Sequence, residues 1–158
     1  MTAARRSVDV NVSPERFYAL LIDFESYPGF VPNQSSARIV ERSENRWRVD
    51  FELSVAKKLT YTLDLVGEPN RSLRWTLVEG DMMRENDGGW TLEELPGGTT
   101  RATYEVNVSL GGFVPRSISK ALVERTMPAN IDAFKREAER RGEQQPPLLR
   151  VSPSAVSS

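Results

Sequence analysis

Hydrophobic and polar residues alternate along much of this chain, in the pattern of half-buried β-strands. The alternation covers 7–12, resumes at residue 36 and continues for most of about seventy residues. Turn-forming residues interrupt it at 43–45, 67–70 and 96–98. The pattern therefore predicts seven antiparallel strands, the last six of them a meander, with a looser segment over 79–89.

Helical signals flank this strand pattern. Ser13 is suited to the N-cap of a short helix over 14–21, and a second short helix is expected over 23–27. Apolar residues then recur at helical spacing over 116–142 and predict a long C-terminal helix. Pro128 lies inside this segment, so we expect the helix axis to kink or the helix to divide.

The predicted sheet needs a cover for its apolar face, and the long helix is the main candidate. We therefore expect an α+β fold, a seven-stranded curved antiparallel sheet around a long C-terminal helix, with two short helices after the first strand. Seven strands offer more apolar face than a helix about 10 Å wide fills. The fold thus predicts either bulky core side chains or a cavity.

The chain contains no His and no Cys, which excludes Ser-His-Asp and Cys-His catalysis. Zinc, copper, haem and iron–sulfur sites draw mainly on those residues, so we expect no such cofactor, although a carboxylate site for magnesium or calcium stays open. The 21 Lys and Arg residues nearly balance the 22 Asp and Glu residues. This balance provides no overall field for nucleic acid, and we expect no specific DNA binding.

The chain shows neither an apolar run of roughly 18 residues, as a membrane span requires, nor the apolar core of a signal peptide near residue 1. We expect a cytoplasmic protein, and peripheral contact with a membrane stays open. Residues 1–142 are expected to form one domain, and 143–158, rich in Pro and Ser, a flexible tail. The sequence carries no signal for the oligomeric state.

This order of elements resembles the START-like, or SRPBCC, superfamily over about residues 8–141. Within it, the chain is most similar to the polyketide cyclase/dehydrase and lipid-transport group, which includes coenzyme Q-binding proteins. The resemblance implies a helix-grip fold whose sheet and long helix enclose a deep apolar pocket, with the loop over 27–32 near its rim. The motifs that carry it are 23–32, 75–81, 89–92, 98–101 and 127–131.

Aromatic residues at inward strand positions, with apolar residues of the rim loop and the long helix, are the candidate ligand contacts. Each aromatic residue could instead fill an ordinary core. We expect the inward polar groups to be phenols and indoles, and no position matches a catalytic residue of the cyclase branch. The orientation of Glu124 and Arg125 near Pro128 stays open. The candidates are Phe24, Tyr27, Phe30, Phe51, Tyr61, Trp75, Met83, Trp90, Tyr104, Phe113, Leu122, Met127 and Ile131.

We expect a protein that binds or carries a hydrophobic small molecule, such as a quinone or other isoprenoid, a lipid or a polyketide. One alternative is a polyketide aromatase/cyclase or dehydratase without a metal or redox cofactor, which convergent polar side chains in the pocket would favour. Another is an interaction module that contacts a ribosome or a membrane. Its surface would be the apolar rim loop or the basic cluster Lys135, Arg136, Arg140 and Arg141.

Overall fold

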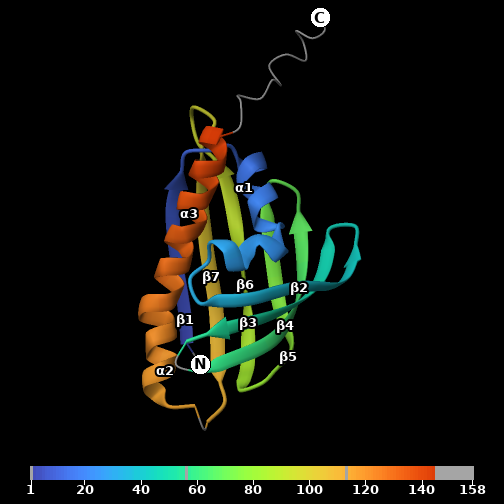
Figure 1. The fold of residues 1–158 in the computed structure, drawn as a ribbon. Coiled ribbons are helices and arrows are strands. Elements are labelled where there is room, and N and C mark those ends of the chain that lie inside the picture. The colour runs from blue at the N-terminus through green and yellow to red at the C-terminus, as the bar shows by residue number, and fades with distance from the viewer. Residues whose placement is uncertain (1, 56, 113, 145–158) are drawn as a thin grey trace, which may run out of the picture.

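The protein is described by a computed structural model that covers residues 2–55, 57–112 and 114–144. The described residues form a single seven-stranded antiparallel sheet in the order β1-β7-β6-β5-β4-β3-β2 (Figure 1). The meander from β2 to β7 and the long helix after it confirm the expected fold. The strands are β1 (Thr2–Val10), β2 (Gln34–Ser43), β3 (Arg46–Ser54), β4 (Lys58–Glu68), β5 (Ser72–Gly80), β6 (Met83–Glu94) and β7 (Thr100–Leu110).

Two short helices follow β1, as expected. Helix α1 (Pro14–Leu21) begins after Ser13, whose hydroxyl oxygen accepts a hydrogen bond from the Arg16 amide at 3.2 Å. The 3-10 helix η1 (Phe24–Gly29) then leads toward β2 and places Tyr27 in the interior.

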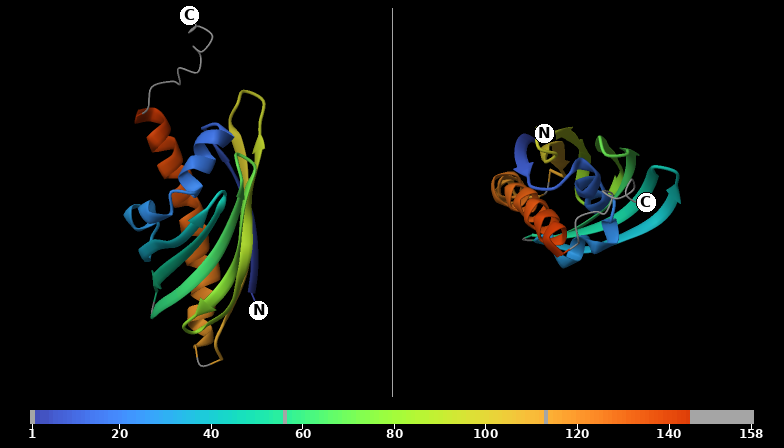
Figure 2. Two further views of the ribbon diagram at one scale, coloured as in Figure 1. Left: turned by 90° about the vertical axis from the view of Figure 1, so that its right-hand side faces the viewer. Right: turned by 90° about the horizontal axis from the view of Figure 1, so that it is seen from above.

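The C-terminal helix is continuous but changes to a π-helical turn just before Pro128, where a disruption was predicted. Helix α2 (Arg116–Ala121) passes into the π-helical turn η2 (Leu122–Thr126), and α3 (Met127–Gln144) follows. The Met127 amide donates to the Leu122 carbonyl, and Pro128 comes directly afterward, where it has no amide hydrogen to donate. Figure 2 shows the sheet curving around this helix, so that its concave face and α3 enclose the core.

The expectation of a loose segment over 79–89 was wrong except at residues 81–82, because β5 extends to Gly80. Strand β6 begins at Met83, and Gly88 pairs with Val106 of β7. A Cβ atom on Gly88 would lie 2.1 Å from the Glu105 carbonyl oxygen, so the two backbones approach closely. Pairing with β7 holds this weakly β-forming segment extended, because cross-strand contacts outweigh local preference.

The convex face of the sheet is mostly polar, with exposed Val40, Val66 and Val78 as exceptions, and carries ion pairs between neighbouring strands. Arg48 Nε lies 2.7 Å from Asp64 Oδ1 between β3 and β4, and Arg101 Nε lies 2.9 Å from Asp9 Oδ1 between β7 and β1. Apolar side chains therefore gather on the concave face. No helix within the described ranges is long and apolar enough to cross a membrane.

Candidate ligand cavity

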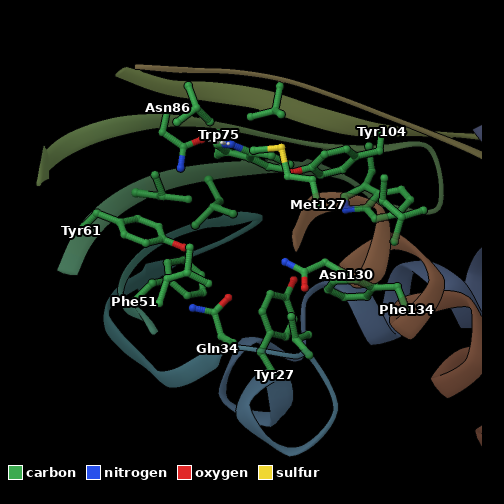
Figure 3. Close-up of a pocket in the computed structure, with 18 of the residues that line it drawn as sticks. Tyr27, Gln34, Phe51, Tyr61, Trp75, Asn86, Tyr104, Met127, Asn130 and Phe134 are labelled. Carbon is green, nitrogen blue, oxygen red and sulfur yellow. Dashed lines mark hydrogen bonds between the residues drawn. The ribbon is translucent and has the colours of Figure 1, made fainter. Parts of the chain in front are cut away.

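A cavity of about 110 Å³ lies between the concave face of the sheet, η1 and α3 (Figure 3). Strand β3 contributes Phe51, β4 contributes Tyr61 and β7 contributes Tyr104, while Ile131 of α3 faces them from the helix. The volume is somewhat smaller than that of an engineered apolar cavity, about 150 Å³, that holds benzene. The cavity thus has room for about one substituted ring.

Seven aromatic rings line this cavity, and each contacts the next, so that they form a continuous arc around it. Neighbouring ring centroids lie between 5.0 Å (Tyr27 to Phe134) and 6.0 Å (Tyr27 to Phe51) apart. Stacked, tilted and edge-on contacts of this kind stabilise an aromatic cluster beyond simple burial. The arc runs in the order Trp75, Tyr104, Trp90, Phe134, Tyr27, Phe51 and Tyr61.

The structure brings ten of the twelve described candidates around the cavity. Phe24 does not line it, because its ring is fully buried against Tyr27 and Trp47 behind the cavity wall. Phe30 is also outside, where it packs on Phe134. Phe113 lies outside the described residues. The ten are Tyr27, Phe51, Tyr61, Trp75, Met83, Trp90, Tyr104, Leu122, Met127 and Ile131.

Three amide side chains that the sequence did not single out also line the cavity: Gln34, Asn86 and Asn130. The expectation that phenols and indoles would be the sole inward polar groups was therefore wrong. Gln34 begins a strand just after the rim loop, and Asn86 lies in the segment expected to be loose. Of the three, only Asn130 was predictable as a lining residue, because it follows Met127 by three positions and therefore lies on the same side of the helix.

Several of these polar groups are already satisfied by the protein. The Tyr27 hydroxyl donates to the Leu21 carbonyl at 2.5 Å, which anchors η1 to the end of α1. Trp75 Nε1 donates to Asn86 Oδ1 at 3.0 Å, and Gln34 Nε2 donates to the Glu52 carbonyl at 3.0 Å. These bonds fix the orientation of the cavity wall before any ligand enters.

Asn130 joins the long helix to the rim loop. In the orientation that satisfies its amide, Nδ2 donates to the Thr126 carbonyl at 3.1 Å and to the Pro32 carbonyl at 3.2 Å. The side-chain oxygen is left on the cavity side. One residue therefore ties α3, η2 and the segment after η1 together and presents an acceptor to the cavity.

The Tyr61 hydroxyl is hydrogen-bonded to the Gln34 side chain, whereas the Tyr27 hydroxyl is held by the Leu21 carbonyl. Burial raises the pKa of Tyr61 to about 12, although the neighbouring Gln34 amide acts in the opposite direction. Burial, reinforced by the nearby Tyr61, also raises the pKa of Tyr104. Both phenols are therefore neutral donors at physiological pH.

No Asp, Glu, Lys or Arg is among the described residues that line the cavity. Glu124 and Arg125, whose orientation the sequence left open, are both exposed to solvent. The cavity thus holds hydrogen-bonding groups but no side chain that is charged or acts as a base at neutral pH. Across the described ranges, no group of three or more His, Cys, Asp or Glu residues is placed to hold a metal ion.

The basic cluster at the end of α3 is mostly engaged within the protein. Lys135 Nζ lies 2.8 Å from Glu139 and 2.7 Å from the Asp9 carbonyl oxygen. Arg140 and Arg141 both bind Glu137, and Arg141 also reaches Asp23 at 3.1 Å, which connects α3 to the start of η1. These charges hold the helix against β1 and η1.

A curved antiparallel sheet that grips a long C-terminal helix around an apolar cavity defines the START-like, helix-grip class of proteins. Solved structures of that class superpose on the described fold. An aromatase/cyclase, Zhui from Streptomyces sp. R1128, matches with a TM-score of 0.79 at 21% identity, covering 89% of this chain and 94% of its own. A START superfamily protein from Mycobacterium smegmatis matches with a TM-score of 0.75 at 18% identity, covering 87% and 97%.

The chain belongs to the polyketide cyclase / dehydrase and lipid transport family, whose model matches residues 10–135. Among curated proteins, it is similar to the ribosome association toxin RatA of Escherichia coli K12. The two are 28% identical over 108 residues, which is 68% of each chain. The subgroup suggested by the sequence motifs, the coenzyme Q-binding proteins, stays a prediction.

Proposed function

We propose that the protein binds an uncharged hydrophobic small molecule in the cavity between its sheet and α3. The observation that carries this proposal is the cavity of about 110 Å³ lined by seven contacting rings. An ordinary core is packed without voids of this size, because each one forfeits dispersion contacts. A cavity kept open by an anchored aromatic wall and by satisfied amides is typical of a binding site.

The proposal can be tested by titrating the protein with quinones, aromatic ketones and fatty acids of increasing size. Trp75 and Trp90 line the cavity, so their fluorescence should change on binding, and the melting temperature should rise. Val106→Phe would fill the cavity from β7 and should abolish both effects. Val66→Phe adds the same group to the exposed face of β4 and serves as the matched control.

Binding by Val66→Phe but not by Val106→Phe would support the proposal, provided that both variants unfold cooperatively. Native mass spectrometry of the purified protein would show whether a ligand remains bound after expression. No change in fluorescence or melting temperature with any compound would contradict the proposal, as would equal binding by both variants.

A polyketide cyclase or dehydratase is the second candidate, because polar side chains converge on the cavity. Tyr61, Tyr104 and Asn130 could orient and polarise a ketone. Cyclisation and dehydration also require a proton acceptor, and each titratable group among the described lining residues is a phenol with a raised pKa. Conversion of a poly-ketone substrate by the wild type but not by Tyr61→Phe would establish this alternative over simple binding.

We do not assign contact with a ribosome to the basic end of α3, although the similarity to RatA raises that possibility. Lys135 and Arg141 pair with acidic groups of the same chain, which reduces the charge available to a nucleic-acid partner. Co-sedimentation with ribosomes that is lost on charge reversal of Arg136, an exposed cation of that end, would overturn this choice.

A further inference from the structure

Strands β5 and β6 pair with each other over only part of their length. Residues 72–75 of β5 pair with 88–91 of β6, and the pair nearest their common turn is Trp75 with Gly88. Beyond this pair, 76–80 follow β4 while 83–87 follow β7 (Figure 1). The sheet therefore contains a split between 76–80 and 83–87, which no backbone pairing closes.

The inner side of this β5–β6 split belongs to the cavity wall. Trp75 comes from one side of the split, Met83 and Asn86 come from the other, and all three line the cavity. On the outer face of the sheet, Thr76 and Asp87 are exposed to solvent. Paired backbone closes the wall between β3 and β4 and between β6 and β7. Along the split, side chains alone separate the cavity from solvent.

One side-chain hydrogen bond between described residues crosses the split. Trp75 Nε1 donates to Asn86 Oδ1 at 3.0 Å (Figure 3). The Asn86 amide also reaches the Met83 sulfur at 3.6 Å, a weak contact within β6. Side-chain rotations are much faster than movements of whole elements. The split can therefore open by side-chain rotation, without the loss of any strand pair.

We propose that ring-sized ligands enter and leave the cavity through the β5–β6 split, with the hydrogen bond between Trp75 and Asn86 as its latch. This inference rests on the proposed binding function and deepens it, because it names the route and the residue that controls exchange. Asn86 is then a positioning residue, which holds the Trp75 indole across the split. Exchange by this route leaves the contacts between η1 and α3 in place.

The first test closes the split from outside the cavity. Thr76→Cys and Asp87→Cys together place one thiol on each side of the split, and the natural chain has no Cys that could compete. A short bifunctional thiol reagent then joins the two strands, and the same protein before treatment is the reference. Neither position lines the cavity, so the cross-link adds nothing to the binding site.

Association and dissociation of acetophenone, a ring-sized neutral molecule, are followed by stopped-flow fluorescence of Trp75 and Trp90, which line the cavity. We expect the cross-link to slow both rates about tenfold and to leave the dissociation constant within about twofold, because a blocked route raises the barrier without changing its end states. Ser72→Cys with Thr91→Cys is the matched control, since it joins the same strands where they are already paired. Its cross-link should leave both rates unchanged.

The second test removes the latch. Asn86→Leu keeps a side chain of similar size and deletes the acceptor for Trp75 Nε1. Association should become about fivefold faster, which corresponds to one neutral hydrogen bond lost from the closed position. A residue that merely supported the fold would slow or weaken binding when replaced. Faster association therefore distinguishes a latch from a structural contact.

Rates that are unaffected by the cross-link over the split would overturn the inference and leave the proposed binding function intact. Equal slowing by the control cross-link would also overturn it, because general stiffening of the sheet would then control exchange. Association that is not faster in Asn86→Leu would show that Asn86 is no latch.

If the wild type binds larger hydrophobic molecules but not acetophenone, entry of ring-sized ligands through the split is also wrong. Failure of every ligand of every size to bind the wild type would overturn the proposed function itself.

Discussion

The Tyr18 hydroxyl packs so closely against Gly67 that there is no space for a larger residue at position 67. A Cβ atom on Gly67 would lie 2.0 Å from the Tyr18 hydroxyl oxygen and 3.3 Å from a ring carbon of Trp47. The hydroxyl itself has no hydrogen-bond partner. Tyr18 thus stabilises the core through the packing of its ring, while its buried hydroxyl oxygen carries a desolvation cost.

We predict that Gly67→Ala destabilises the protein by about 2 kcal/mol, because the new methyl group overlaps Tyr18. Tyr18→Phe should be stabilising by about 1 kcal/mol, since it removes a buried polar atom without breaking a bond. The double variant should recover much of the loss. Urea unfolding of the four proteins checks this, and a Gly67→Ala penalty that is identical in both backgrounds would contradict the proposed overlap.

The sequence pattern predicted the aromatic residues that line the cavity but not all of its polar residues. The inward aromatic residues were predictable, because alternation assigns them to one face of each strand. Gln34 and Asn86 were not, because polar residues at strand ends and in a glycine-containing segment are indistinguishable from loop residues in sequence. Their role depends on partners distant in the chain, Glu52 for Gln34 and Trp75 for Asn86.

At the scale of elements, the strands and helices were largely predictable, and their ends were less so. Strand β1 begins at Thr2 rather than near Ser7, because β7 offers it a full-length partner from Thr100 to Val108. Such extension is decided by pairing and has no local signal. The irregular turn of the C-terminal helix near Pro128 was predictable because the effect of proline is local and covalent.

Glu137 is the acidic group that joins the two arginines near the end of α3. Hydrogen bonds from Arg140 and Arg141 lower the pKa of Glu137 to about 2, against an opposing effect of burial. Its folded-state pKa is thus below the ordinary value of about 4.5. The ion pairs therefore contribute stability above about pH 4.5, and this contribution is lost as the pH falls toward 2.

We predict that Glu137→Gln lowers the unfolding free energy by about 1 kcal/mol at pH 7, a modest value because Arg140 is half exposed and solvent screens the pair. The difference between wild type and variant should shrink as the pH falls from about 4.5 to 2, as measured by urea unfolding at several pH values. Glu44→Gln, in an exposed turn, is the control. A difference that is independent of pH across this window would show that the ion pairs do not stabilise the helix end.

At the scale of the whole molecule, the cavity is smaller than the pockets that hold drug-sized ligands. Pockets for such ligands commonly measure about 300–1,000 Å³, and this one measures about 110 Å³. The wall that would have to move is held by Asn130, which bonds to the Pro32 carbonyl, and by Arg141, which bonds to Asp23. Ring-sized molecules fit the cavity as it stands, and we expect larger ones to require η1 to separate from α3.

The difference between ring-sized and larger ligands predicts two kinds of binding kinetics. The association rate of acetophenone should rise linearly with its concentration, while that of a ligand with several rings should reach a plateau set by the opening step. Stopped-flow fluorescence of Trp75 and Trp90 distinguishes them. Arg141→Gln should raise the plateau by weakening the connection to η1, and a plateau unaffected by this change would place the opening elsewhere.

The most direct test of binding inside the cavity is the position of a bound molecule in solution. Intermolecular NOEs between acetophenone and the protein should involve methyl groups of the lining residues Val106, Met127 and Ile131. NOEs confined to the exposed Val66 and Val78 of the convex face would contradict binding between the sheet and the helix.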